Sequence, residues 1–149
     1  MTRNIVVPNG ACDCHFHVFK HGAPTIPGAL AAPEDETVTR YRAMRDSLGL
    51  TRAVIVQSTA YGTDNSVTAE GITALGAKDT RGIAIVDETA SDTLLGELTD
   101  AGFCGARFHM LPGGIIGWDQ LDRIAERVHG FGWHSQLQLD GRTLPDRAA

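Results

Sequence analysis

The sequence lacks any apolar run long enough to cross a membrane, and its three cysteines are an odd number. A transmembrane helix needs about 18–20 consecutive apolar residues, so no membrane contact is expected. Residues 1–8 also lack the apolar core of a signal peptide, which favours a cytoplasmic protein. Cys12, Cys14 and Cys104 match neither the C-x-x-C redox spacing nor zinc-ribbon spacing, so we expect reduced thiols.

Basic residues are in the minority, with 13 Lys and Arg against 18 Asp and Glu, for a formal net charge of −5. Nucleic-acid binding depends on surplus positive charge that displaces phosphate counterions, so nucleic acid is not an expected partner. The sequence also lacks the G-x-S-x-G of serine hydrolases and the Lys-Ser/Thr of a Walker loop. These absences disfavour nucleic-acid, serine-nucleophile and phosphate-loop functions.

Short β-rich runs alternate with segments of helical periodicity. The predicted strands are 11–19, 53–57, 82–86, 104–110 and 133–139, and the predicted helices are 36–47, 65–75, 91–100 and 118–129. This alternation predicts an α/β fold with parallel strands. A (β/α)8 TIM barrel has about 250 residues, and five-eighths of that is about 156. The 149 residues therefore match about five βα units of such a barrel, with a flavodoxin-like doubly wound sheet as the alternative.

We accordingly predict a single partial TIM-barrel domain over residues 1–149, truncated before strands six to eight. Such a sheet has open parallel edges and an uncovered inner face. We therefore expect a fragment of a longer chain, association with a missing C-terminal half, or a homo-oligomer of partial barrels. The apolar residues expected on surfaces that need such a partner are Trp133, Leu137, Ile55 and Val86.

The sharpest local motif is Asp13-Cys14-His15-Phe16-His17 in the first predicted strand. Strand side chains alternate between faces, so Asp13, His15 and His17 are expected on one face. Two imidazoles at the mouth of a barrel can bind a divalent metal or polarise a substrate carbonyl. A pair of hydrogen-bonded structural histidines is the alternative.

Further polar candidates lie on later predicted strands and loops. Arg107 and His109 share a face by the same alternation, and a guanidinium suits a carboxylate ligand. A structural ion pair for Arg107 and a hydrogen-bonded filler role for His109 are the alternatives. Gln138, with Gln136, indicates either a polar pocket or structural amides. Ser58 and Tyr61 follow the second strand, where a βα loop meets substrate, although turn and capping roles explain such loops equally well.

Four segments together resemble the amidohydrolase superfamily, in particular its amidohydrolase-2 metal-dependent hydrolases. They are D-C-H-F-H-V-F at 13–19, V-Q-S-T-A-Y-G-T-D-N at 56–65, G-A-R-F-H at 105–109 and W-H-S-Q-L-Q-L-D-G at 133–141. The resemblance is strongest to the branch that contains 2-pyrone-4,6-dicarboxylate lactonase, 4-sulfomuconolactone hydrolase and D-galactarolactone isomerase.

The resemblance implies hydrolysis of a lactone or cyclic ester that carries a carboxylate. It makes His15 and His17 the catalytic pair, either binding one divalent metal ion (zinc or manganese) or orienting the lactone carbonyl without metal. It makes Arg107 a contact of the substrate carboxylate. The expected strand faces and loop positions make His109, Gln138, Ser58 and Tyr61 further candidates for substrate binding.

The sequence departs from the branch in two places. Basic residues that follow the fourth strand in pyrone-dicarboxylate enzymes are replaced by Met110-Leu111-Pro112-Gly113-Gly114, which disfavours that substrate. The strand-six histidine and the strand-eight aspartate that serves as general base are absent. A non-catalytic or half-barrel subunit that binds ligand or assembles with a partner is therefore the alternative to a complete enzyme.

Overall fold

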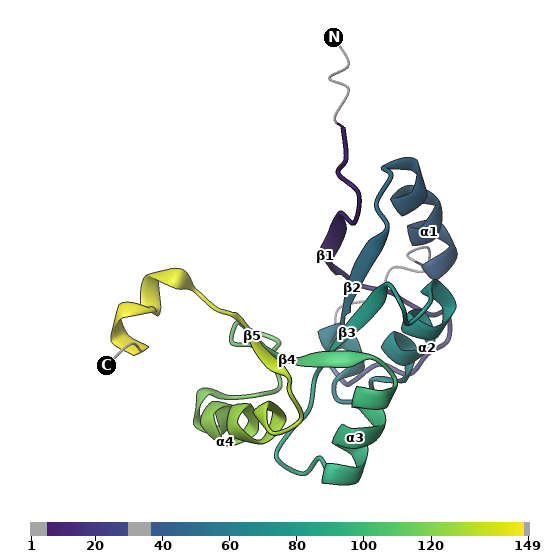
Figure 1. Cartoon of the computed structure of the whole chain (residues 1–149). Coiled ribbons are helices and arrows are strands. Elements are labelled where there is room, and N and C mark those ends of the chain that lie inside the picture. The colour runs from purple at the N-terminus through teal and green to yellow at the C-terminus, as the bar shows by residue number, and fades with distance from the viewer. Residues whose placement is uncertain (1–5, 30–36, 148–149) are drawn as a thin grey trace.

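A computed structural model of the chain describes residues 6–29 and 37–147, and these form one curved sheet of five parallel strands covered by helices (Figure 1). The strands are β1 (Cys12–Phe16), β2 (Arg52–Val56), β3 (Thr80–Ala84), β4 (Phe103–His109) and β5 (His134–Gln138). The helices between them are α1 (Val38–Ser47), α2 (Ser66–Leu75), α3 (Asp92–Asp100) and α4 (Trp118–His129). The α/β class and the predicted element order are confirmed.

The strand order β1-β2-β3-β4-β5 follows the chain without a reversal. A doubly wound sheet reverses direction at a switch point, so the flavodoxin-like alternative is wrong. Right-handed crossovers that all run one way place the helices on one face of the sheet. In agreement, α2 packs on β2 and β3, and α4 packs on β4 and β5. The result is a half-barrel with a helix-covered convex face and an open concave face.

Local sequence signals explain most element boundaries. Thr37 accepts a hydrogen bond from the backbone N–H of Arg40 and so caps α1, while Ser91 caps α3 through the N–H of Leu94. The predicted start of the first helix at Glu36 lies outside the described residues. After β5, the chain continues in two short 3-10 turns, Gly141–Thr143 and Pro145–Arg147.

A bulge in β1 changes the faces of its side chains. Asp13 pairs with Ala53 and Phe16 with Ile55, so β1 uses one residue more than β2 between these two pairs. Asp13 and Phe16 both contact Tyr41 of α1, by a hydrogen bond and by ring stacking respectively. The prediction that Asp13 shares a face with His15 and His17 is therefore wrong, because the bulge shifts the alternation.

The hydrophobic core lies between the sheet and the helices. Its largest fully buried side chains include Phe108, Ile55, Ile72, Leu95 and Val128. Trp133, Ile55 and Val86 are also buried within this chain, so the expectation that they lie on surfaces needing a partner is wrong. Leu137 on β5 does remain 41% exposed. Among the described residues, no helix combines the length and apolar character needed to span a membrane.

Candidate active site on the concave face

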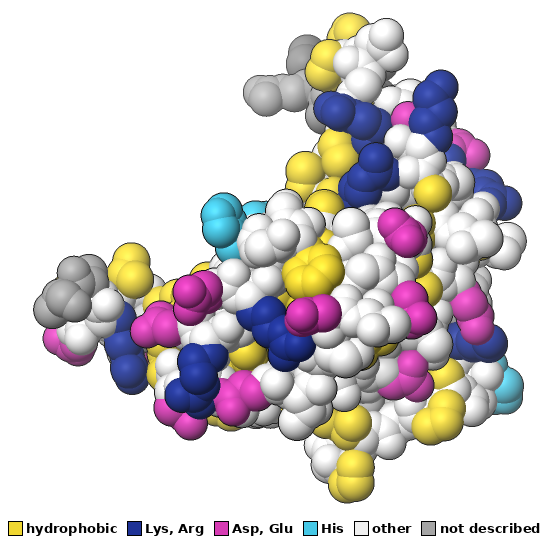
Figure 2. All heavy atoms as spheres, turned by 60° about the horizontal axis from the view of Figure 1, so that its bottom comes forward, with side chains coloured by type: hydrophobic (Ala, Val, Ile, Leu, Met, Phe, Trp, Pro, Cys, Tyr) yellow, Lys and Arg dark blue, Asp and Glu magenta, His cyan; other side chains and the backbone are white. Residues whose placement is uncertain are grey.

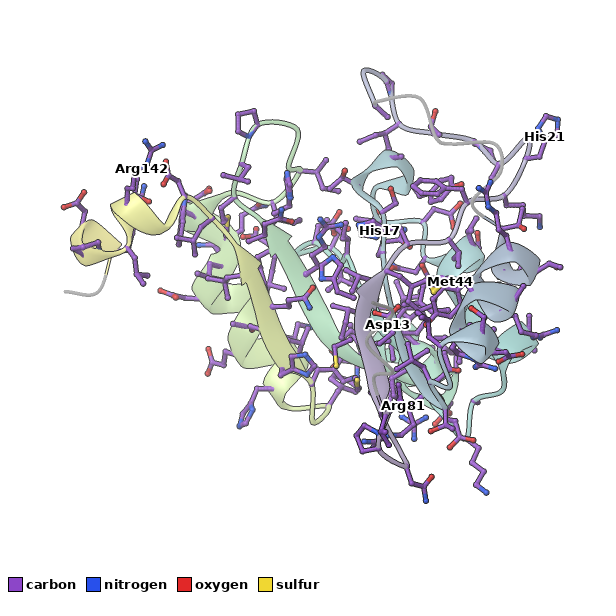
Figure 3. The ribbon with its side chains drawn as sticks, turned by 90° about the horizontal axis from the view of Figure 1, so that it is seen from above. Asp13, His17, His21, Met44, Arg81 and Arg142 are labelled. Atoms are coloured by element: carbon purple, nitrogen blue, oxygen red, sulfur yellow. The ribbon has the colours of Figure 1, made fainter. Side chains whose placement is uncertain are left out.

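The concave face collects polar side chains from three strand ends. His15 and His17 come from β1 and the residues after it, and Arg107 and His109 come from β4. Gln138 lies opposite His109 in the β4–β5 register. Figure 3 shows His17 at the end of β1 and places His21 far out in the following loop. The carboxyl ends of parallel strands thus bring residues from distant parts of the sequence together.

The two histidines form an edge-to-face pair. Their ring centroids are 5.2 Å apart, and the His17 Nδ1 lies 2.7 Å from the carbonyl oxygen of Val56. Because a carbonyl oxygen can only accept, Nδ1 carries the proton in this contact, and Nε2 of His17 keeps its lone pair. That lone pair can accept a proton or bind a metal ion.

The surroundings of both histidines favour the neutral imidazole. Burial and the positive charge of Arg107 lower the pKa of His15, against an opposing effect of Asp13. Burial lowers the pKa of His17, with further contributions from Arg107 and His15, against the opposing hydrogen bond to Val56. Neutral rings are the form required for metal binding or for accepting a proton from water.

Arg107 is a buried cation held by neutral groups. The residue is only 6% exposed, and its Nη1 donates a hydrogen bond to the carbonyl oxygen of Gln57 at 2.7 Å. Nη2 donates to Oε1 of Gln138 at 2.8 Å, while Nε has no hydrogen-bond partner. Within the described ranges, no Asp or Glu forms an ion pair with Arg107. The structural ion pair considered from the sequence is therefore not found there.

His109 and Gln138 extend the cluster around Arg107. His109 Nδ1 lies 3.0 Å from Gln138 Oε1 and 3.5 Å from Arg107 Nη2. Gln136, which pairs with Arg107 in the β4–β5 register, has a buried Oε1 without a hydrogen-bond partner. The predicted inward face of β4 and β5 is thus a connected polar surface.

Ser58 and Tyr61 have local structural contacts. The Ser58 Oγ accepts a hydrogen bond from the N–H of Ala60 and caps the 3-10 turn Thr59–Tyr61. The Tyr61 hydroxyl accepts a hydrogen bond from the N–H of Lys20 at 3.1 Å. Both residues are buried, and Tyr61 connects the β1–α1 and β2–α2 loops. Their predicted contact with substrate stays a prediction.

Gln57 is a positioning residue that the sequence analysis did not single out. Its main-chain oxygen accepts from Arg107, and its side chain links the carbonyls of Gly62 and Asp64 to the hydroxyl of Thr68. It is completely buried. One feature of the sequence could have indicated this role, since Gln57 directly follows the β-branched run 54–56. An amide side chain at the end of a buried strand needs several hydrogen-bond partners.

The histidine pair supplies too few ligands for a closed metal site. A zinc site uses three or four protein ligands, of which His15 and His17 supply two. Across residues 6–29 and 37–147, no group of three or more His, Cys, Asp or Glu side chains could hold a metal ion. A metal ion bound through His15 and His17 would complete its coordination with other ligands.

Sizeable cavities also occur away from this cluster. A cavity of about 320 Å³ lies between α3 and α4, with Leu95, Ile124 and Val128 in its lining and with Arg123 and Arg127 beside it. Arg123 pairs with Glu88, and Arg127 pairs with Asp92 at 2.7 Å. None of the concave-face candidates lines this cavity, so volume alone does not identify the reactive site.

Comparison with known proteins gives the same family as the motifs. A family model described as Amidohydrolase matches residues 12–149. D-galactarolactone isomerase of Agrobacterium fabrum is 35% identical over 96% of this chain and 49% of its own length. 2-Pyrone-4,6-dicarboxylate hydrolase of Comamonas testosteroni is 36% identical over 94% of this chain and 47% of its own length. The chain thus spans about half the length of these curated relatives.

Solved structures agree with the half-barrel. An apo crystal structure from Agrobacterium tumefaciens superposes with a TM-score of 0.87 at 33% identity, covering 94% of this chain and 52% of that chain. A structure of a probable 2-pyrone-4,6-dicarboxylic acid hydrolase from Acinetobacter baumannii gives a TM-score of 0.81 at 24% identity, covering 92% and 52% respectively. The five strands therefore correspond to about half of these larger folds.

Proposed function

Because the chain belongs to the amidohydrolase family, we propose that its concave face binds and hydrolyses a lactone or cyclic ester that carries a carboxylate. The relatives support this substrate class, since they are named as a lactone isomerase and as a hydrolase of a pyrone dicarboxylate. A 4-sulfomuconolactone hydrolase of Rhizobium radiobacter is also 34% identical over 86% of this chain and 43% of its own length.

The observation that carries the proposal is Arg107. It is a buried guanidinium oriented by the oxygens of Gln57 and Gln138, so its charge is not neutralised by a carboxylate of the described chain. A fixed guanidinium is well suited to bind a carboxylate through paired hydrogen bonds. A substrate carboxylate would supply the missing negative charge.

The histidine pair supplies the reactive groups in this proposal. Because Nδ1 of His17 is occupied by the Val56 carbonyl, its Nε2 keeps a lone pair that can take a proton from the attacking water. His15, as a neutral imidazole, can donate a hydrogen bond to the ester carbonyl and so stabilise negative charge that develops on its oxygen. Proximity to Arg107 helps to keep both rings neutral near pH 7.

The polar surface suits a lactone with few negative charges. Arg107 is the one cation in the cluster, and the residues after β4 are Met110-Leu111-Pro112-Gly113-Gly114 without a basic side chain. A dicarboxylate would leave one of its charges without a cation from these segments. We therefore propose a monocarboxylated lactone in preference to a pyrone dicarboxylate.

A metal ion and additional strands belong to the proposal only as additions to this chain. One zinc or manganese ion would be held by His15 and His17 together with ligands from elsewhere, and it would supply Lewis-acid activation of the carbonyl or of water. Those ligands would come from a C-terminal half, in the same or a separate chain, or from a second copy. No step above depends on the ion.

The proposal is tested by binding and turnover on one set of variants. Monocarboxylated γ-lactones and 2-pyrone-4,6-dicarboxylate are titrated by NMR, and ring opening is followed by acid release. Arg107→Gln is expected to lose about 10- to 100-fold in affinity, in line with about 1.5–3 kcal/mol for a hydrogen bond to a charged group. Arg81→Gln is the control, because Arg81 lies near the amino end of β3, apart from His17 (Figure 3). Equal affinity in the Arg107→Gln and wild-type chains would disprove the carboxylate role.

A ligand-binding subunit without turnover is the second candidate. Two features of the concave cluster favour it. Arg107, His109 and Gln138 are linked by hydrogen bonds, as in a ligand-binding surface. Within the described chain, no carboxylate that could act as a general base is hydrogen-bonded to these three residues. Binding without acid release, both with and without added zinc, would support this candidate over the hydrolase.

A further inference from the structure

Cys12 and Cys14 form a pair of neighbouring free thiols at the beginning of β1. The Cys14 thiol donates a hydrogen bond to the carbonyl oxygen of Cys12 at 3.7 Å, so it is folded back toward Cys12. The Cys12 thiol in turn donates a hydrogen bond to the carbonyl oxygen of Asp13 at 3.5 Å. Cys14 is exposed and Cys12 is half-buried, which leaves the pair open to a reagent from solvent.

The backbone geometry allows the two sulphurs to be joined. Residues two apart on a strand are separated by about 6.6 Å, because each residue rises about 3.3 Å. Disulfides span Cα separations of about 4.4–6.8 Å, so a regular strand is near the upper limit. The β1 bulge lies between Asp13 and Phe16 and releases Cys14 from regular pairing with β2, which gives it room to approach Cys12.

A cationic cavity adjoins this thiol pair. It has a volume of about 270 Å³, and its lining includes Cys12, the basic residues Arg52, Lys78 and Arg81, and one acidic residue, Asp79. Arg52 donates to the carbonyl oxygen of Gly10 and Arg81 to that of Thr80, so these contacts do not neutralise their charges. In the space-filling view, dark blue Lys and Arg side chains gather near the N-terminal segment (Figure 2). This local excess of positive charge is notable in a chain with a net charge of −5.

We propose that Cys12 and Cys14 are a redox-modification site that reacts preferentially with anionic low-molecular-weight disulfides, of which glutathione disulfide is the representative, and closes to an intrachain disulfide. Each half of glutathione disulfide carries two carboxylates and one ammonium group. Arg52, Lys78 and Arg81 would attract that net negative charge to the cavity beside Cys12. Cys14 directly precedes His15, but the cavity lies at the amino ends of the strands and none of the concave-face candidates lines it, so the proposal does not rest on the proposed hydrolase function.

The reaction proceeds by two thiol–disulfide exchanges. The Cys14 thiolate attacks one sulphur of glutathione disulfide, the bond between the two glutathione sulphurs breaks, and one glutathione leaves as its thiolate. The Cys12 thiolate then attacks Cys14 Sγ, forms the Cys12–Cys14 bond and releases the second glutathione. The two cysteines lose two protons and two electrons, and glutathione disulfide is reduced to two molecules of glutathione.

The order of attack follows from the surroundings of the thiols. Cys14 is exposed, so a disulfide reagent from solvent reaches it first. Cys12 is half-buried and therefore reacts second, and burial also raises the pKa of its thiol. Cys104 is half-buried, and burial raises the pKa of its thiol, which makes it the internal control.

The first experiment treats the native chain with glutathione disulfide, alkylates the remaining thiols and maps them by mass spectrometry. We expect Cys12 and Cys14 to become protected together, with a mass loss of two hydrogens and no retained glutathione, while Cys104 stays alkylated. C12S should stop at a glutathione adduct on Cys14, and C104S should behave like the wild type. Three results would each overturn the proposal. They are a glutathione adduct on Cys14 that is as abundant in the wild type as in C12S, a disulfide between two chains, and full alkylation of both Cys12 and Cys14.

The second experiment tests the charge preference, first in the wild-type chain and then in two variants. The rate of Cys14 modification is measured with glutathione disulfide and with cystamine, a cationic disulfide, in native chain and in chain unfolded by urea. We expect the rate ratio to be at least about threefold larger in the native chain and to decrease with added salt. Lys78→Gln and Arg81→Gln, checked for native circular dichroism, should lower it toward the unfolded value. A native ratio equal to the unfolded ratio would show that the cavity does not attract the anion.

Discussion

Arg107 and Gln138 are joined across β4 and β5 by a 2.8 Å hydrogen bond from Nη2 to Oε1. Arg107 is in register with Gln136, and His109 is in register with Gln138. The hydrogen bond therefore runs diagonally along one face of the sheet, from Arg107 to the residue two positions beyond its direct partner. The same amide oxygen lies 3.0 Å from His109 Nδ1. Gln138 therefore orients both polar residues that β4 contributes to the concave face.

Replacing Gln138 with Leu should loosen this arrangement. Removing one acceptor from a buried guanidinium costs about 1–3 kcal/mol, so we expect a lower free energy of unfolding and weaker binding of carboxylated ligands. Chemical denaturation and NMR titration measure the two effects. Ser135→Ala, an exposed position on the same strand, is the control and should change neither quantity. Unchanged carboxylate affinity in Gln138→Leu would show that Gln138 does not orient Arg107.

Removing the Arg107 charge should raise the pKa values of both His15 and His17. Burial lowers both values, and the positive charge of Arg107 lowers them further because it disfavours a second cation nearby. In Arg107→Gln, NMR titration of the imidazole protons should therefore show both rings titrating at higher pH than in the wild type. Arg81→Gln should leave both titrations in place. A downward movement in Arg107→Gln would contradict the electrostatic arrangement described here.

The stability of the chain should fall in mild acid. A histidine whose pKa is lower in the folded chain than in the unfolded chain binds protons preferentially after unfolding. His15 and His17 are of this kind. Their contribution to the free energy of unfolding is therefore fully present above the unfolded pKa of about 6.5 and is lost as the pH decreases below that value. Urea unfolding at pH 7.5 and 5.5 measures the loss, which should be smaller in His17→Gln. An equal loss in both proteins would rule out His17 as a source.

The contact between α1 and the β1 bulge should contribute measurably to stability. The Tyr41 hydroxyl donates to Asp13 Oδ2 at 3.2 Å, and Asp13 Oδ1 accepts from the N–H of His15 at 3.3 Å. Tyr41→Phe keeps the stacking on Phe16 and removes the hydroxyl, so we expect a loss of about 0.5–1.5 kcal/mol. Tyr41→Ala, which also removes the ring, should cost about 3–5 kcal/mol. Similar losses in the two variants would mean that the ring contributes little.

Two glycines make a matched pair for a packing test. A Cβ at Gly105 would lie 2.8 Å from the His134 ring and 2.9 Å from Ile83 Cδ1, whereas a Cβ at Gly96 in α3 would meet nothing within 4 Å. Gly105→Ala should therefore destabilise by about 1–3 kcal/mol and displace His134 on the concave face. Gly96→Ala should stabilise by about 0.5–1 kcal/mol, because alanine favours the helix. Thermal unfolding measures both, and a neutral Gly105→Ala would show that His134 moves freely.

Parts of the candidate site could be predicted because neighbouring residues alone determine them. Arg107 and His109 lie two residues apart on β4 and so share a face. His15 lies on β1 and His17 directly after it, and their rings are in contact as the same spacing predicted. The strand and helix periods similarly predicted every major element, with β3 displaced by two residues from its predicted start at Gly82. The role of Gln57 could not be predicted, because its contact with Arg107 joins residues 50 positions apart.

The sequence by itself determined the alternation of strands and helices, the amidohydrolase motifs and the polar residue pairs, since side-chain period and capping are properties of adjacent residues. Only the tertiary structure decided that Asp13 faces α1, that Arg107 is held by Gln57 and Gln138, and that Cys12 adjoins Lys78 and Arg81. These relationships depend on strand register and on the β1 bulge. Both result from packing between segments that are distant in the sequence, which no local period encodes.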